Sequence, residues 1–313
     1  MNLSKAISLY LSHMRSLGHR FISEDRLLKA FCKAVGDLPL ETIESGAVLA
    51  FFNRTGSVTE YWVKKHSVLT GFYGFAMARG LVVGSPLPLQ IPTQTDPAFQ
   101  PYIYSETEIK NLLDASQAAC AGKCQIESFV LRALLVLLYG AALRLGEALS
   151  LTIADVNLDQ AILRIRGTKF FKSRLVPIGR DLATAMTAYL TKRNDWHRPS
   201  EAAAFFCFRD GQALTIHTVE AAFRRLRAFA GIRREGGPRR QPRLHDLRHS
   251  GVVHRVVAWH RSGADVQDLL PKLATYLGHV DLHGTQRYLT MTPELLREAS
   301  LRFERYAMEV DHA

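Results

Sequence analysis

The stretch His245-Asp246-Leu247-Arg248-His249 opens the segment that decides the fold of this chain. Leu277-Gly278-His279 closes that segment, and Tyr288 follows nine positions after His279. The apolar pattern from Val252 to Leu270 predicts a helix, in which His245 and Arg248, three residues apart, lie on one face. An imidazole beside a guanidinium suits a phosphate group that must be held while protons move around it.

The densest positive charge in the chain lies immediately before this segment. Eight arginines occupy the twenty positions from residue 224 to residue 243, and five of them are candidate DNA contacts: Arg224, Arg225, Arg239, Arg240 and Arg243. A solvated basic loop is the simpler interpretation. We favour a surface that follows phosphates, because the cluster adjoins the candidate site.

Composition narrows the class of partner. The 313 residues predict about two domains, and a hydrophobic content of 47% with 22% charged residues is typical of a globular protein. The formal net charge of +11 favours a polyanionic partner, most often nucleic acid, although ribosome-associated and membrane-surface proteins share this property. Cys32, Cys120, Cys124 and Cys207 form no C-x-x-C pair, so we expect four free thiols.

Targeting signals are missing from the pattern. The N-terminus lacks a basic region followed by an apolar core and a cleavage site, and the longest apolar run, Ala133 to Leu143, is too short to span a bilayer. We therefore expect a soluble, cytoplasmic protein without a membrane partner.

The first part of the chain has helical periodicity. Residues 1–85 are predicted as a small helical domain, in which Lys64 and Lys65 lie on a basic helix face. A solvated face is the simpler interpretation of these lysines, and DNA contact is the alternative that we keep. Five prolines between Gly84 and Pro101 predict a stiff linker over residues 86–101.

The second domain is predicted over residues 102–313 and contains further candidate site residues. Ser105 and Glu108 begin a helix as a capping box, and an apolar helix from Phe129 to Tyr139 precedes Arg144. Glu147 is one turn after Arg144 and can brace its guanidinium, and a structural ion pair is the alternative. Period-two alternation from residue 161 predicts a β-hairpin with Lys169 at or near its turn.

Arg144, Lys169, His245-x-x-Arg248, Leu277-Gly278-His279 and Tyr288, in this order, resemble the active-site set of the tyrosine recombinase family, which includes phage integrases and Xer-type enzymes. The resemblance runs through essentially the whole chain, with residues 58 to 86 similar to the last helix of that family's core-binding domain. It implies a mainly α fold with a small antiparallel β-sheet: a helical, SAM-like core-binding domain followed by a mixed α/β catalytic domain.

The resemblance also implies a role for each residue. Tyr288 is the expected nucleophile, forming a 3′-phosphotyrosine and a free 5′-hydroxyl. Arg144 and Arg248 are expected to hold the non-bridging phosphate oxygens, a task that suits the planar guanidinium. Lys169 would protonate the leaving 5′ oxygen. The remaining roles are proton transfer by His245, a hydrogen bond from His279 to the phosphate, and orientation of these groups by Glu147.

No cofactor and no metal are expected. The arginines, the lysine and the histidines supply the positive charge that a divalent ion would otherwise bring, and the chain has no G-x-x-x-x-G-K-[ST] loop for ATP. The implied partners are double-stranded DNA and three further copies in a homotetramer on paired sites, with other recombinases or accessory factors as additional candidates. The implied function is site-specific recombination for DNA integration, excision or transposition of a mobile element.

Several alternatives remain at this point. Lys172 competes with Lys169, His249 and His254 are interpreted as structural or phosphate-adjacent, and Pro271 is expected to break a helix within an insertion spanning residues 259–271. The apolar stripe of residues 293–308 predicts a C-terminal helix that packs in cis or on a neighbouring protomer. A type IB topoisomerase and a DNA-binding accessory protein with a decayed site are the rival functions.

Overall fold

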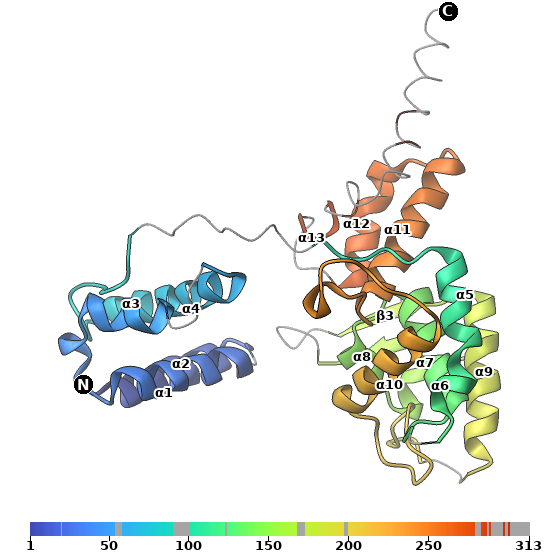
Figure 1. The fold of residues 1–313 in the computed structure, drawn as a ribbon, viewed down its shortest axis with the longest axis horizontal. Coiled ribbons are helices and arrows are strands. Elements are labelled where there is room, and N and C mark those ends of the chain that lie inside the picture. Colours follow the sequence, from blue (N-terminus) through green and yellow to red (C-terminus); the bar gives the residue numbers. More distant parts are fainter. Residues whose placement is uncertain are drawn as a thin grey trace, which may run out of the picture. The chain divides into compact units, whose positions relative to one another are not determined.

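The computed structural model describes residues 1–19, 21–53, 58–89, 100–122, 124–167, 173–196, 200–278, 283–286, 288, 297 and 300. The chain divides into two compact units with their boundary at residues 99 and 100, inside the segment predicted as a linker (Figure 1). The domain bounds at residues 85 and 102 stay predictions. No helix in the described part of the chain is long and apolar enough to cross a bilayer.

The first unit is helical. Its elements are α1 (Leu3–Ser16), α2 (Ile22–Val35), the 3-10 helix η1 (Leu40–Thr42), α3 (Ser45–Asn53) and α4 (Glu60–Ala78). The apolar faces of the amphipathic helices α1 and α2 pack with α4 in one core that includes Leu28, Phe31, Trp62 and Phe72. Thr59 caps α4 by accepting a hydrogen bond from the Trp62 backbone N–H.

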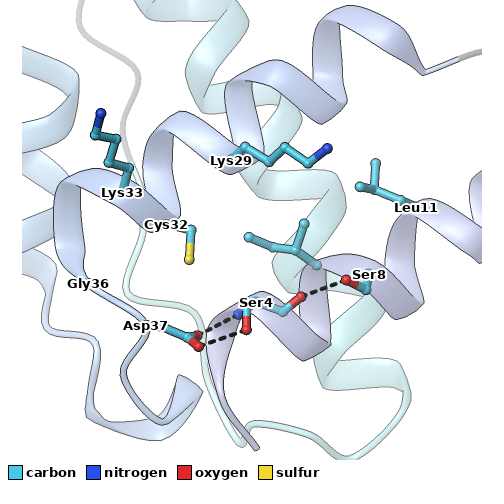
Figure 2. Close-up of a pocket in the computed structure, with 9 residues that line it drawn as sticks. Ser4, Ser8, Leu11, Lys29, Cys32, Lys33, Gly36 and Asp37 are labelled. Atoms are coloured by element: carbon cyan, nitrogen blue, oxygen red, sulfur yellow. Dashed lines mark hydrogen bonds between the residues drawn. The ribbon is translucent and has the colours of Figure 1, made fainter.

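A shallow pocket lies between α1 and α2 of this unit (Figure 2). At its edge the Asp37 carboxylate accepts hydrogen bonds of 2.8 Å from the backbone N–H and from the hydroxyl of Ser4. These hydrogen bonds lower the pKa of Asp37. The carboxylate therefore satisfies an N–H group in the first turn of α1 and joins the segment after α2 to that turn.

The second unit is mixed. Its elements are α5 (Glu106–Asp114), α6 (Ser116–Cys120), α7 (Ser128–Gly140), α8 (Leu145–Leu149), η2 (Ile153–Asp155), β1 (Val156–Asn157), β2 (Ile162–Ile165), β3 (Arg174–Pro177), α9 (Arg180–Asn194), α10 (Ile216–Phe229), η4 (Pro238–Arg240), α11 (Asp246–Arg261), α12 (Val266–Leu277) and α13 (His283–Gln286). Ser105 and Glu108 form the predicted capping box of α5. The predicted fold class, mainly α with a small antiparallel sheet, is confirmed.

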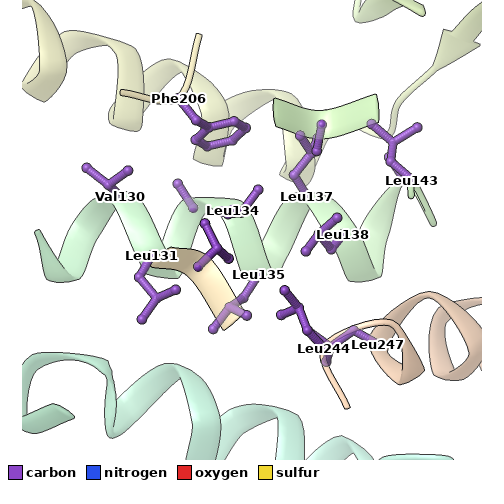
Figure 3. Close-up of a cluster of buried hydrophobic side chains, with 14 of the residues drawn as sticks. Val130, Leu131, Leu134, Leu135, Leu137, Leu138, Leu143, Phe206, Leu244 and Leu247 are labelled. Carbon is purple, nitrogen blue, oxygen red and sulfur yellow. The ribbon is translucent and has the colours of Figure 1, made fainter. Parts of the chain in front are cut away.

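Helix α7 is the centre of this unit. It is apolar on several faces and packs against α9 and α11. Figure 3 shows its leucines between Phe206 and the segment that carries Leu244 and Leu247. A helix that is hydrophobic around most of its circumference needs several partners, which explains why α6, α8, α9 and α11 all pack on α7.

The predicted hairpin is present as β2 and β3, and β1 extends it to a three-stranded antiparallel sheet. Leu163, Ile165 and Val176 are buried, whereas Arg164 and its partner Leu175 are exposed. This alternation follows from the period of a strand. Arg174 lies on the same inner face as Val176, and its side chain therefore points into the unit.

Two helices, rather than one, span the segment after His245. The helix predicted from Val252 to Leu270 ends at Arg261, and Gly263 adopts a φ of +72° before α12 begins. The expectation that Pro271 breaks a helix is wrong, because Pro271 lies inside α12. A proline in the second turn removes one N–H donor, and the remaining hydrogen bonds and the apolar packing of α12 maintain the helix.

A close contact fixes where α11 crosses α7. A Cβ atom on Gly251 would lie 2.2 Å from the carbonyl oxygen of Tyr139, so only glycine permits this approach. The hydroxyl of Tyr139 and Nδ1 of His254 form a hydrogen bond of 2.8 Å at the same crossing. His254 therefore has the structural position that the sequence suggested. The four cysteines are free thiols, as predicted.

Candidate active site

Glu147 lies at the centre of a cluster of guanidinium groups. Arg144 precedes α8, and its backbone N–H donates to Oε2 of Glu147 at 3.0 Å. Nη1 of Arg144 donates to Oε1 of the same carboxylate at 2.9 Å. The spacing of three residues across the start of a helix brings these groups together.

A second arginine holds both oxygens of this carboxylate. Nη1 and Nη2 of Arg174, on β3, donate to Oε1 and Oε2 of Glu147 at 3.1 and 3.0 Å. This is the bidentate geometry that suits a guanidinium and a carboxylate. Sequence reasoning did not single out Arg174. Its period-two relation to buried Val176 was the signal that placed it on the inner face of the sheet.

Arg248 reaches the same cluster from α11. Its Nη1 donates to the Ala142 carbonyl at 2.5 Å and lies 3.9 Å from Oε2 of Glu147, and its Nη2 donates to the Leu277 carbonyl at 2.9 Å. The Arg248 side chain is 3% exposed, whereas that of Arg144 is 42% exposed. Burial first, and the charge of Arg144 second, lower the pKa of Arg248 to about 10. Arg248 is thus the buried arginine of the cluster, and Arg144 is the arginine that solvent reaches.

Three successive carbonyls at the end of α12 each accept from a different arginine. The Tyr276 carbonyl accepts from Nε of Arg174 at 3.0 Å, and the Leu277 carbonyl accepts from Arg248. The Gly278 carbonyl accepts from Nη2 of Arg144 at 3.4 Å. The last carbonyls of a helix have no partner within the helix and carry partial negative charge, so they bind cations well.

The charge state of Glu147 follows from these contacts. Burial raises the pKa of its carboxyl group, but the hydrogen bonds from Arg174 and Arg144 and the charges of both outweigh it and hold the pKa at about 2. The group is therefore a carboxylate at neutral pH.

His245, His249 and Tyr288 form the other part of the candidate site. The hydroxyl of Tyr288 and Nδ1 of His249 form a hydrogen bond of 3.1 Å, and the Tyr288 side chain is buried. The His249 ring packs edge-on against the His245 ring, with centroids 4.8 Å apart. Removal of water by surrounding protein atoms, followed by the charge of Arg248, lowers the pKa of His245 to about 4. His245 is therefore neutral at neutral pH, although its residue remains exposed at the surface.

The remaining predicted residues of the site are not all described. Lys169, its competitor Lys172 and His279 lie outside the described residues. The Gly278 carbonyl, which belongs to the peptide bond leading into His279, does contact Arg144. Sequence reasoning treated His249 as structural or phosphate-adjacent and did not anticipate its contact with Tyr288, because that contact joins residues 39 positions apart.

The candidate DNA contacts differ in exposure. Arg224, Arg240 and Arg243 are exposed, and Arg243 also pairs with Asp246 at 3.3 Å. Arg225 is half-buried and donates to the Ala121 carbonyl at 3.3 Å, whereas nothing is described of the Arg239 side chain.

Lys64 and Lys65, the two lysines predicted to contact DNA, differ in exposure. Lys64 is exposed and donates to the hydroxyl of Ser23 at 3.1 Å. Lys65 is buried, and its ammonium donates to the carbonyls of Phe51 and Phe52 at the end of α3, at 2.8 and 3.4 Å. The prediction that Lys65 presents its charge to DNA is corrected accordingly: on α4 it faces the core and satisfies carbonyls that α3 leaves without a helical partner.

A helical unit followed by a mixed unit, with three arginines around a carboxylate and a buried tyrosine hydrogen-bonded to His249, points to the class of tyrosine recombinases, which recombine DNA at specific sites. The chain belongs to the phage integrase family, whose pattern matches residues 103–294.

Two relatives agree with this assignment. A Sinorhizobium fredii protein whose name includes the words integrase/recombinase is 35% identical over 309 residues, covering 96% of both chains. The tyrosine recombinase XerC of Chlorobaculum parvum is 30% identical over 251 residues, covering 75% of this chain and 70% of that protein.

Two solved structures show the same fold. A Tn1549 transposon integrase in complex with circular intermediate DNA has a TM-score of 0.70 at 16% identity, covering 96% of this chain and 99% of its own. A lambda integrase tetramer bound to a Holliday junction has a TM-score of 0.64 at 18% identity, and the match covers 90% of this chain and 78% of the lambda integrase chain.

Proposed function

We propose that this recombinase breaks and rejoins DNA through Tyr288, with Arg144 and Arg248 holding the phosphate. The phenol gives up its proton, which His245 takes in the proposed scheme, and the phenol oxygen attacks the phosphorus and forms a phosphotyrosine while the 5′ oxygen leaves. Lys169 gives that oxygen a proton. Rejoining reverses these steps, so that the bond energy of the broken linkage is conserved in the intermediate and no external energy source enters the scheme.

The observation that carries this proposal is the convergence of Arg144 and Arg248 on one carboxylate. Two guanidinium groups from elements about one hundred residues apart lie within 4 Å of Glu147. Such a cluster can stabilise the charge that accumulates on a five-coordinate phosphorus. The Tyr288 hydroxyl forms a hydrogen bond with His249, and His249 follows Arg248 directly on α11. Helix α11 therefore connects the tyrosine to this cluster.

The remaining roles rest on the family resemblance together with position. His245 moves protons beside Arg248, His279 donates a hydrogen bond to the phosphate, and Glu147 orients the two arginines. Lys64, Arg224, Arg240 and Arg243 are exposed and are proposed to contact the DNA backbone. Arg225 and Arg239 remain part of the same proposed surface.

Double-stranded DNA is the proposed substrate, and four copies on paired sites form the proposed assembly. The lambda integrase tetramer on a Holliday junction supports this assembly. Integration or excision of a mobile element is the proposed process. The relative of 35% identity, whose name includes integrase/recombinase, and the fold shared with a transposon integrase support this process.

A nicked half-site DNA tests the chemistry. The nick lets the short 5′-hydroxyl strand diffuse away after cleavage, so the covalent adduct accumulates and migrates more slowly on a denaturing gel. The unmodified chain should form this adduct in the presence of a chelator, and Tyr288→Phe should form none while retaining affinity for the DNA. An adduct formed equally by Tyr288→Phe would refute the assignment of the nucleophile.

A supercoiled plasmid with two target sites distinguishes recombination from the topoisomerase alternative. Recombinant products are expected. Relaxed plasmid without recombinant products would instead support a type IB topoisomerase.

A further inference from the structure

Arg174 is more completely enclosed than a surface strand residue would be. Its side chain is 12% exposed, and its three nitrogens donate to Oε1 and Oε2 of Glu147 and to the Tyr276 carbonyl. The proposed chemistry uses Arg144 and Arg248 but gives Arg174 no task. Enclosing a guanidinium costs free energy, and these three matched acceptors offset that cost by holding the side chain in one orientation.

The first consequence of these contacts concerns competition for the phosphate. Glu147 is close to three guanidinium groups, two of which are proposed to hold the phosphate. A carboxylate and a phosphate oxygen bind the same donors. Arg174 donates to both carboxylate oxygens from the side of the sheet. These two hydrogen bonds restrain Glu147 and weaken its interaction with Arg144 and Arg248.

The second consequence concerns the end of α12. Gly278 adopts the left-handed conformation, with φ +67°, and a Cβ atom there would lie 2.8 Å from Nη1 of Arg174. The Arg174 guanidinium therefore packs directly on the turn that leads to residue 279. Together with its hydrogen bond to the Tyr276 carbonyl, this contact joins β3 to the end of α12.

We propose that Arg174 is a positioning residue of this site, which keeps Glu147 from competing with the phosphate and holds the α12 terminus where Arg144 and Arg248 meet. The inference rests on the proposed function, since it assigns Arg174 a task only if those two arginines bind phosphate. Lysine should replace it poorly, because an ammonium cannot hold two carboxylate oxygens and a carbonyl in one plane.

The test measures adduct formation on the nicked half-site under single-turnover conditions at 25 °C, over a range of protein concentrations. Arg174→Gln should lower the maximal rate about 10- to 100-fold, the range expected when catalytic groups shift by about 1 Å, while half-site affinity changes less than about threefold. Arg174→Lys should recover only part of this loss. Arg164→Gln, which removes the same charge from an exposed position on the neighbouring strand, is the matched control and should keep the unmodified rate.

The double variant E147Q/R174Q separates positioning from a purely structural role. If Glu147 competes with the phosphate once Arg174 is gone, removing its charge should make the double variant cleave faster than Arg174→Gln alone. Because the two side chains are in direct contact, a merely structural ion pair predicts that the double variant cleaves no faster than Arg174→Gln alone. A double variant that cleaves no faster than Arg174→Gln, an unchanged maximal rate in Arg174→Gln, or a fall in half-site affinity as large as the fall in rate would each overturn the inference. Should Arg174→Gln fail to fold, an Arg174→Lys variant with the unmodified rate would overturn it.

Failure of the inference and failure of the proposed function give different results. A normal adduct in the Arg174 variants, lost only in Tyr288→Phe, rejects the positioning role and leaves the proposed chemistry intact. An adduct that survives in Tyr288→Phe rejects the proposed chemistry itself.

Discussion

Replacing Glu147 by glutamine removes the only negative charge that the described contacts place among Arg144, Arg174 and Arg248. The magnitude follows from the pKa of Glu147, which lies at about 2 against an ordinary value of 4.5. At about 1.4 kcal/mol for each pKa unit, the folded state gains about 3.5 kcal/mol from this carboxylate. This gain agrees with the cost of about 3–5 kcal/mol for removing one partner of a buried ion pair. At about 2–4 °C for each kcal/mol in a unit of this size, the melting temperature should fall by about 7–14 °C.

Calorimetry of the full chain at pH 7 measures this change, with Glu235→Gln as the control because Glu235 is an exposed acid in the same unit. The pH dependence supplies an independent check. Because folding lowers the pKa of Glu147, its contribution is complete above about pH 4.5 and is lost as the pH falls through about 2. The gap between Glu147→Gln and the unmodified chain should therefore narrow below pH 4.5. A melting temperature within 2 °C of the control at pH 7 would refute the electrostatic account, with 2 °C being roughly the effect of 1 kcal/mol or less.

Three further predictions concern single residues. Gly278→Ala should slow adduct formation and lower the melting temperature by a few degrees, because alanine at φ +67° costs about 1–2 kcal/mol and its Cβ displaces the Arg174 guanidinium. His249→Phe should slow adduct formation more than His249→Asn, since asparagine keeps a side-chain amide that can form a hydrogen bond with the phenol hydroxyl; equal rates would contradict a role for Nδ1. Lys65→Met should destabilise the first unit by about 1–3 kcal/mol, because carbonyls of α3 lose their partner. The salt dependence of DNA binding should not change in this variant, whereas Lys64→Met should reduce its slope by about 0.9 if Lys64 contacts one phosphate.

The sequence predicted those parts of the fold that depend on local pattern. The apolar run of α7, the capping box at Ser105 and the alternation of β2 and β3 each have a physical cause within a few residues. The break between α11 and α12 was misplaced, because the rule that proline breaks a helix neglects how many hydrogen bonds remain around Pro271. Gly263, with its positive φ, was the better signal.

The site was only partly predictable for a related reason. The motif order predicted Arg144, Arg248 and Tyr288 as site residues, but it did not show that Arg174 contacts Glu147 or that His249 contacts Tyr288, because those contacts join separate elements. Lys65 illustrates the opposite error, in which a basic pair on a helix was assigned to DNA although one of its members faces the core. Contacts that close over long sequence separations require the packed structure.

The charges around Glu147 explain why one carboxylate among three arginines suits the proposed reaction. Among the described groups, three guanidinium groups and one carboxylate leave a net charge of +2, and His245 adds none at neutral pH because its pKa is about 4. The proposed proton donor Lys169 would add a further positive charge until it gives up its proton. A phosphodiester carries a single negative charge, whereas the five-coordinate arrangement that forms on attack by a phenoxide carries two. The positive charge of the site therefore exceeds the charge of the bound phosphodiester and can stabilise the additional negative charge of the transition state, which is the condition for lowering the barrier. Without Glu147, Arg144 and Arg248 would bind the unreacted phosphate more tightly and repel each other, and part of their interaction energy would contribute to substrate binding instead of rate.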